Sequence, residues 1–207
     1  MKKKILAAVV TLGLALGTAA QSFVLDNSIL ATSLTLDVPG IPYSGTFGME
    51  LWVLGGTSIP PGINLGAAPG SGLRGYDIML ADGFLKEATY ANQQTPFPGV
   101  FSLGSPLVNG GNGGTVVVAL AAWNSSAPSW SAMLAQANQA TRAGVVVFDQ
   151  PIVPFITNPL SPAGLAMNRD LVLTSIPEPP ALALGALCAA LLFIAHRGRM
   201  PIGRFRI

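Results

Sequence analysis

Two valine-rich apolar runs constrain the fold of this chain more than any other feature. They are TVVVALAAW at residues 115–123 and GVVVFD at residues 144–149, and the only charge in either is the final Asp149. Short, nearly continuous apolar runs rich in β-branched residues are typical of central strands covered on both faces. The sequence therefore predicts a β domain with a layer of structure on each side of these strands.

A third segment, GTFGMELWVLGG at residues 45–56, alternates between apolar and other residues. Because side chains of a strand point to opposite faces in turn, Phe47, Met49, Leu51 and Val53 should share one buried face, with Thr46, Glu50 and Trp52 on the other. Weaker strand candidates are 22–26, 31–38, 76–81, 84–90, 99–103 and 170–175. About nine strands at irregular spacing favour a mainly β fold of the β-sandwich or jelly-roll kind.

One short helix is expected after the first valine-rich run. Ser129 can cap its start and Gly144 can close its end. The residues that recur at helical spacing are Trp130, Met133, Leu134, Ala137 and Thr141.

Two glycine-rich stretches, 55–75 and 109–114, predict loops. Neither contains the G-x-x-x-x-G-K-[ST] pattern, so we do not expect a phosphate-binding loop.

Both ends of the chain carry membrane-directed patterns. Three lysines at residues 2–4 precede an apolar stretch that ends in Thr18, Ala19 and Ala20, which predicts a signal peptide over 1–20. Near the other end, Ala181–Ala195 contains no charged residue, and as a helix it would rise about 22 Å. This is short for a typical bilayer, but flanking residues can extend the span, and we expect a transmembrane helix.

The residues around this span resemble a known sorting signal. Pro177-Glu178-Pro179, the apolar span and the basic pair Arg197 and Arg199 are similar in order to the PEP-CTERM signal. The resemblance implies export by a Gram-negative bacterium and recognition by an exosortase in its inner membrane, with Pro177, Glu178 and Pro179 as the sorting motif. The two arginines act in this interpretation as the membrane stop on the cytoplasmic side. The expected division is therefore a signal peptide (1–20), an ectodomain (21–176), a sorting and anchor segment (177–199) and a basic tail (200–207).

Charge and residue types exclude several function classes for residues 21–176. Four basic and eight acidic residues give this part a net charge of −4, so we expect no nucleic-acid partner. The single cysteine, Cys188, and the single histidine, His196, both lie beyond it. The ectodomain therefore has no disulfide, no Cys or His metal site and no histidine-dependent catalytic triad, and we expect neither a metal nor a cofactor.

Glu50 and Trp52 are the candidate ligand-binding residues. They lie two apart on one strand face, where an indole next to a hydrogen-bond acceptor could stack against a sugar ring. Packing beneath a second layer is the alternative for Trp52, and likewise for Trp123 and Trp130. Glu50 could also pair with Asp77 or Asp82 for glycoside hydrolysis. The two aspartates could instead contribute to a calcium site or lie on the surface as solvated charges.

We therefore expect a non-enzymatic, exported cell-surface or extracellular-matrix protein. The alternative is a secreted carbohydrate-active enzyme or a carbohydrate-binding module that uses Glu50 and Trp52. The expected partners are an exosortase, by resemblance, and the membrane. The chain would either stay anchored in the inner membrane or be handed on to the cell surface and its exopolysaccharide.

Overall fold

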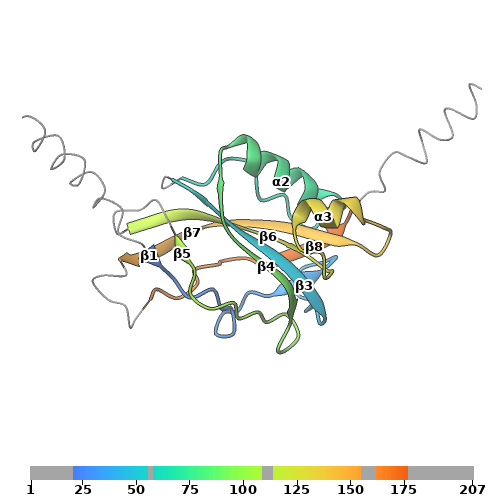
Figure 1. Ribbon diagram of the computed structural model, residues 1–207, viewed down its shortest axis with the longest axis horizontal. Helices are drawn as coiled ribbons and strands as arrows, with labels where there is room; N and C mark the ends of the chain where they lie inside the picture. Colours follow the sequence, from blue (N-terminus) through green and yellow to red (C-terminus); the bar gives the residue numbers. More distant parts are fainter. Residues whose placement is uncertain (1–20, 56–57, 109–113, 155–161, 177–207) are drawn as a thin grey trace, which may run out of the picture. The chain divides into compact units, whose positions relative to one another are not determined.

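The computed structural model describes residues 21–55, 58–108, 114–154 and 162–176 (Figure 1). The expected signal peptide, sorting segment and basic tail lie outside the described residues, as does most of the second glycine-rich stretch. Within the described ranges, no helix is both long enough and apolar enough to cross a bilayer.

The described domain is mainly β, as predicted, with two helices instead of the one that was expected. In chain order the elements are β1 (Gln21–Ser22), β2 (Leu34–Leu36), β3 (Thr46–Leu54), α2 (Ser71–Ala81), β4 (Leu85–Gln94), β5 (Leu107–Val108), β6 (Gly114–Trp123), α3 (Trp130–Ala135), β7 (Arg142–Pro154) and β8 (Leu171–Ser175).

Four long antiparallel strands form the centre of the sheet, in the order β4-β3-β6-β7. The long strand β7 continues past this group at both of its ends. Its first two residues pair with β8, which pairs in parallel with β2, and its last two pair with β1, which also pairs with β5. The short strands therefore extend from the two ends of β7.

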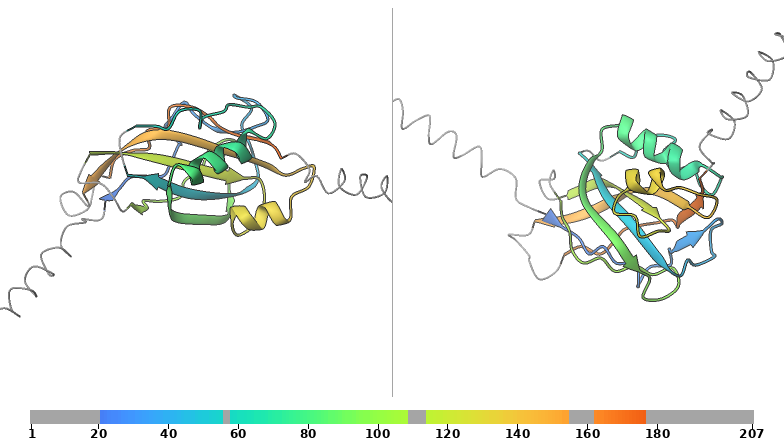
Figure 2. Two further views of the ribbon diagram at one scale, coloured as in Figure 1. Left: turned by 90° about the horizontal axis from the view of Figure 1, so that it is seen from above. Right: turned by 45° about the vertical axis from the view of Figure 1, so that its right-hand side comes forward.

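The central strands are buried on both faces, as the valine-rich runs predicted. On β6, Val116, Val118 and Leu120 face one apolar cluster, which also contains Leu34 from β2 and Leu171 from β8. Val117, Ala119 and Ala121 alternate with them and face a second cluster beneath the helices. The helices α2 and α3 lie together on one side of the long strands (Figures 1 and 2).

Helix α2 is the largest departure from the sequence-based expectation. The loop predicted over 55–75 ends at Ser71, and the strand predicted over 76–81 is helical. The helix packs on β7, where Gly72 lies so close to the Ala143 carbonyl that a Cβ at this position would overlap it. Glycine, which is typical of loops, here permits a close helix-to-strand contact.

Helix α3 begins where the sequence predicted. The Ser129 hydroxyl accepts a hydrogen bond from the Ala132 N–H at 3.2 Å, which caps the first turn. The helix ends at Ala135, and Gly144, expected to close it, lies instead within β7. A Cβ at Gly144 would overlap the Val172 carbonyl of β8, so this glycine also serves a close backbone contact.

The weaker strand predictions were partly right. Strands occur within or across 31–38, 84–90 and 170–175, whereas the candidate 22–26 shares only Ser22 with β1. The candidate 99–103 is not a strand, since only an isolated bridge between Ser102 and Asp26 forms there. Whether such a segment becomes a strand depends on the pairing of its backbone groups with neighbours far along the chain.

Candidate functional site

The first candidate site is centred on Glu50 of β3. Strand alternation places Glu50 and Trp52 on the sheet face that lies beneath the helices, and the Trp52 indole Nε1 donates a hydrogen bond to Glu50 Oε2 at 3.1 Å. Both side chains are buried, with 1% of Glu50 and 8% of Trp52 exposed. The indole face is therefore part of the core and offers little surface on which a sugar ring could stack.

Donors from four elements surround the Glu50 carboxylate. Besides Trp52, the Tyr76 hydroxyl of α2 donates to Oε2 at 3.3 Å. The Trp130 backbone N–H, at the start of α3, donates to Oε1 at 3.2 Å, and the Lys86 Nζ of β4 lies 3.4 Å from the same oxygen. A buried carboxylate is costly unless hydrogen bonds and opposite charge compensate it, and here both do. The carboxylate thus ties β4 and both helices to β3.

Aromatic rings pack around this carboxylate. The Tyr76 ring stacks on the Trp130 ring, with centroids 4.3 Å apart and planes 5° apart. Trp52 meets Tyr76 edge to face at 5.7 Å, and Trp123 meets Trp130 in the same manner at 6.2 Å. Packing, the alternative for all three tryptophans, is what the structure shows.

The environment of Tyr76 affects its ionisation. Burial raises the pKa of the Tyr76 phenol, and the nearby negative charge of Glu50 and the hydrogen bond to it raise this pKa further. The phenol therefore stays protonated at neutral pH and acts as a donor to the carboxylate. The indole Nε1 of Trp130 is buried without an acceptor among the described residues, so stacking and the backbone bond, rather than this N–H, hold the side chain.

Lys86 is the part of this network closest to solvent. Its side chain is 44% exposed, and its Nζ lies 5.6 Å from the centroid of the Trp52 ring as well as beside Glu50. The cation thus covers the outer side of the buried pair. The network that results is suited to holding elements together, because its carboxylate is shielded and already bonded.

The structure does not bring the other predicted acids into this network. Asp77 and Asp82 are exposed at the surface, and Glu50 receives its contacts from Trp52, Tyr76, Lys86 and Trp130. In the part of the chain that the structure describes, no group of three or more His, Cys, Asp or Glu residues is arranged to hold a metal ion.

Sequence reasoning found Glu50 and Trp52 but missed Tyr76 and Lys86. Tyr76 lay in a segment read as a strand, so its helical position could not be used. Lys86 lies opposite Trp52 across the β3–β4 ladder, and this register is interrupted by a bulge. No local signal in the sequence indicates either contact.

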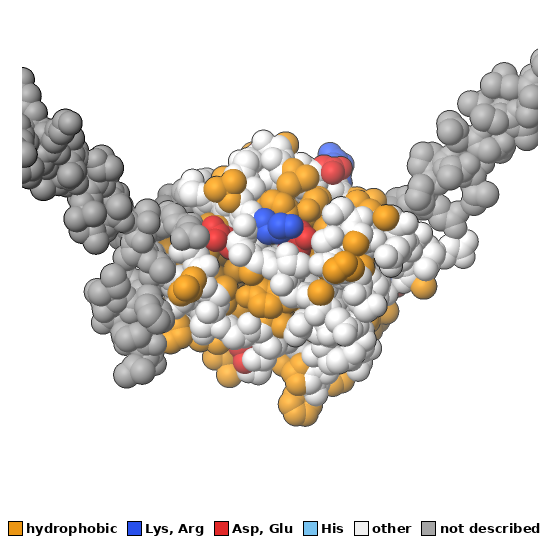
Figure 3. Space-filling view, in the orientation of Figure 1, with side chains coloured by type: hydrophobic (Ala, Val, Ile, Leu, Met, Phe, Trp, Pro, Cys, Tyr) orange, Lys and Arg blue, Asp and Glu red, His pale blue; other side chains and the backbone are white. Residues whose placement is uncertain are grey.

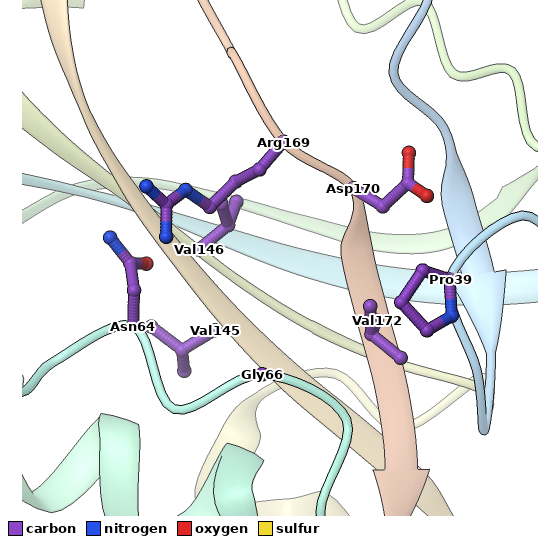
Figure 4. A pocket seen from close by; sticks show the side chains of 8 residues that line it. All are labelled: Pro39, Asn64, Gly66, Val145, Val146, Arg169, Asp170 and Val172. Carbon is purple, nitrogen blue, oxygen red and sulfur yellow. The ribbon is translucent and has the colours of Figure 1, made fainter.

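A second candidate site is a groove between β7 and β8, which we call the β7–β8 groove (Figure 4). The two strands pair only at their corner, through Arg142 with Ser175 and Ala143 with Thr174, and then diverge. The space that opens has a volume of about 260 Å³. It is lined by Pro39, Asn64, Gly66, Val145, Val146, Arg169, Asp170 and Val172.

Side chain to backbone hydrogen bonds fix the walls of this groove. The Asn64 amide donates to the Val147 carbonyl at 2.8 Å and accepts from the Val147 N–H at 2.9 Å, in the manner of a neighbouring strand. The Asp170 carboxylate accepts from the backbone N–H groups of Ser33, at 2.8 Å, and Gly40, at 3.1 Å. Both loops beside the groove are therefore held in place.

Few Lys and Arg side chains are visible on the face drawn in Figure 3, and hydrophobic side chains occur there in separate groups. Exposed apolar residues in the described ranges are spread over strands and loops, and they include Ile29, Leu85, Phe97 and Leu107. Single exposed apolar side chains are ordinary on a protein surface, so they do not define a site.

Comparison with protein-family models, with curated proteins and with solved structures found no match to this chain.

Proposed function

We propose that this chain is a non-enzymatic, exported cell-surface or extracellular-matrix protein that an exosortase processes at a PEP-CTERM-like signal. The observation that carries the proposal is the order of three features near the C-terminus: Pro177-Glu178-Pro179, the uncharged span Ala181–Ala195, and Arg197 with Arg199. A span of this kind with a basic follower favours membrane anchoring with the arginines on the cytoplasmic side. The signal-peptide pattern at residues 1–20 supports the same route.

The geometry around Glu50 supports the non-enzymatic part of the proposal. Glycoside hydrolysis needs two carboxylates that flank a bound sugar. Glu50 is buried and bonded to four donors, while the two aspartates considered as its partners are exposed. The burial of Trp52 likewise does not favour a carbohydrate platform at this position, so we put forward no second function.

We also propose that the ectodomain is of the β-sandwich kind. One apolar cluster contains residues of the long strands together with residues of β2 and β8, and this supports a core of the sandwich kind. The helices cover the opposite face of the long strands.

The anchoring part of the proposal is tested by deleting residues 177–207. The deletion point keeps Ile176, which is buried and donates its N–H to the Thr141 carbonyl at 3.3 Å, so that β8 stays intact. We expect the full chain in the membrane fraction and the shortened chain in the soluble periplasmic or secreted fraction. Identical partitioning of the two chains into the soluble fraction would refute anchoring.

Processing is tested separately, with the span left in place. Replacing Pro177, Glu178 and Pro179 together by alanine should leave the chain in the membrane but abolish cleavage, as read by mass spectrometry of the mature C-terminus. Cleavage at the same position in this variant and in the wild type would show that the motif is not the recognition element.

A further inference from the structure

We propose that the β7–β8 groove binds a small organic carboxylate, with the Arg169 guanidinium and the Asn64 amide as the groups that hold the anion. The site and its ligand class are independent of the export route proposed above, so either could fail without the other. The inference depends on three features of the groove. They are a cation without an ion pair, an N–H group without an acceptor, and an apolar surface that is already in place.

The cation is Arg169. Of the four basic residues between 21 and 176, Lys86 pairs with Glu50, and Arg142 pairs with Asp37 at 2.8 Å. The side chains of Arg169 and Arg74 take part in neither an ion pair nor a hydrogen bond among the described residues. Arg169 alone of these two borders the groove, and its guanidinium extends into it beside Asn64 (Figure 4). A guanidinium has a planar fork of donors that matches a carboxylate.

The second donor is the Asn64 side chain. Its Nδ2 carries two hydrogens, and the bond to the Val147 carbonyl uses one of them. The other hydrogen has no acceptor among the described residues, and the side-chain amide lies beside the Arg169 guanidinium (Figure 4). An anion between the two residues would therefore receive donors from both.

The competing negative charge in the groove is Asp170, and its position favours the proposal. Its two oxygens accept hydrogen bonds from Ser33 and Gly40, and in Figure 4 the carboxylate points away from Arg169. Asp170 therefore stabilises the loop that carries Pro39 without neutralising Arg169. Because the walls are already held by hydrogen bonds, a ligand would not have to order them, which favours binding.

The floor of the groove indicates the size and character of the ligand. Val145, Val172 and Pro39 supply apolar surface, and the groove has a volume of about 260 Å³. This space suits a carboxylate on a single ring-sized body. The proposed ligand is a hexuronate. Its C–H face can pack on the valines while its carboxylate binds Arg169.

The test is saturation-transfer NMR with the full chain in neutral detergent, with glucuronate as the probe and glucose as its uncharged counterpart. We expect saturable binding of glucuronate with a dissociation constant on the order of millimolar, weakened several-fold when salt is raised to about 0.5 M, since the contact is charge-assisted and partly exposed. Glucose should give no saturable signal at comparable concentration. Equal binding of glucose, or no saturable binding of glucuronate, would overturn the proposal.

Variants locate the site. Arg169→Gln should weaken glucuronate binding at least ten-fold. Arg169→Lys keeps the charge but loses the planar pair of donors, so its affinity for glucuronate should lie between those of Arg169→Gln and the wild type. Arg74→Gln removes the same charge from helix α2 and is the matched control, expected to bind like the wild type. If Arg169→Gln and Arg74→Gln have equal effects, the groove is not the site.

Acetate tests the apolar floor. Acetate should bind more weakly than glucuronate, because it leaves the valines uncovered. Equal affinities for the two carboxylates would refute the ring-sized ligand. Unchanged thermal unfolding midpoints of the variants would show that altered binding does not come from misfolding.

Discussion

The backbone N–H of Trp130 donates a hydrogen bond to the buried Glu50 carboxylate, 80 residues earlier in the chain, at 3.2 Å. The start of helix α3 is thereby held by a side chain of the central strand β3. The same carboxylate receives the Tyr76 hydroxyl of α2, so one acid fixes both helices on the sheet. The role of Glu50 in this geometry is structural, and we expect its replacement to lower the stability of the domain.

Replacing Glu50 by alanine should lower the free energy of unfolding by about 3–5 kcal/mol, because it leaves the Trp52 indole and the Trp130 N–H buried without an acceptor. Urea unfolding followed by tryptophan fluorescence measures this loss. Asp77→Ala, an exposed acid on α2, is the control and should change stability by less than about 0.5 kcal/mol. Similar values for the two variants would contradict the role given to Glu50.

The ion pair of Lys86 with Glu50 should contribute much less to stability than the buried hydrogen bonds of Glu50 do. Its ammonium is 44% exposed, so solvent screens the ion pair with Glu50. Lys86→Met, which keeps most of the side-chain bulk, should lower the free energy of unfolding by less than about 1 kcal/mol in the same urea experiment. A loss as large as that of Glu50→Ala would show that the ion pair, rather than the buried donors, dominates.

Gly48 lies against the indole ring of Trp123, and a Cβ at this position would overlap the ring. Gly48→Ala should therefore destabilise the domain by about 1–3 kcal/mol through overpacking, although alanine is a better strand residue than glycine. Because Trp123 is fully buried, near-ultraviolet circular dichroism should change as well. Gly114→Ala, at the start of β6 with no heavy atom within 4 Å of the added Cβ, is the matched control.

Replacing Gly72 by alanine in helix α2 should have two opposing effects on stability. Alanine favours a helix over glycine by about 1 kcal/mol, but here its Cβ would overlap the Ala143 carbonyl of β7. We expect the overlap to prevail, with a net loss of about 1–3 kcal/mol, because β7 is paired on both sides at this point and cannot shift freely. A gain in thermal stability would mean that the helix packs less closely than the structure shows. Arg74→Ala, on the exposed side of α2, should be nearly neutral.

Asp26 should make stability depend on acid pH. Hydrogen bonds from Ser28 and from the Ser102 hydroxyl lower the pKa of the Asp26 carboxyl below its usual value. A carboxyl with a lowered folded-state pKa stabilises the fold above its unfolded pKa, about 4, and this contribution is lost as the pH falls through the folded-state pKa. The stability difference between wild type and Asp26→Asn should therefore shrink below about pH 4, as measured by urea unfolding across pH. Ser102→Ala should reduce the same pH dependence, and an unchanged profile would show that the pKa is not lowered.

Part of this fold could be predicted because its signals are local. The apolar runs at 115–123 and 144–149, the alternation from Phe47 to Val53 and the Ser129 cap each depend on neighbours in sequence, and each is confirmed by the structure. Helix α2 could not be predicted in the same way. Gly72 and Gly75 are poor helix residues when read alone, and what they permit is the close approach of the helix to β7, which is some 70 residues later in the chain.

The candidate sites could likewise be predicted only in part from the sequence. The amino-acid sequence by itself determined that Glu50 and Trp52 share a strand face, because a strand repeats every two residues, and that residues 21–176 have no thiol or imidazole for chemistry. Only the tertiary structure decided that this face is covered by helices, and that Asn64 and Arg169 line the same groove. The covering of this face by helices and the divergence of β7 from β8 arise from contacts between residues far apart in the chain, which no local pattern encodes.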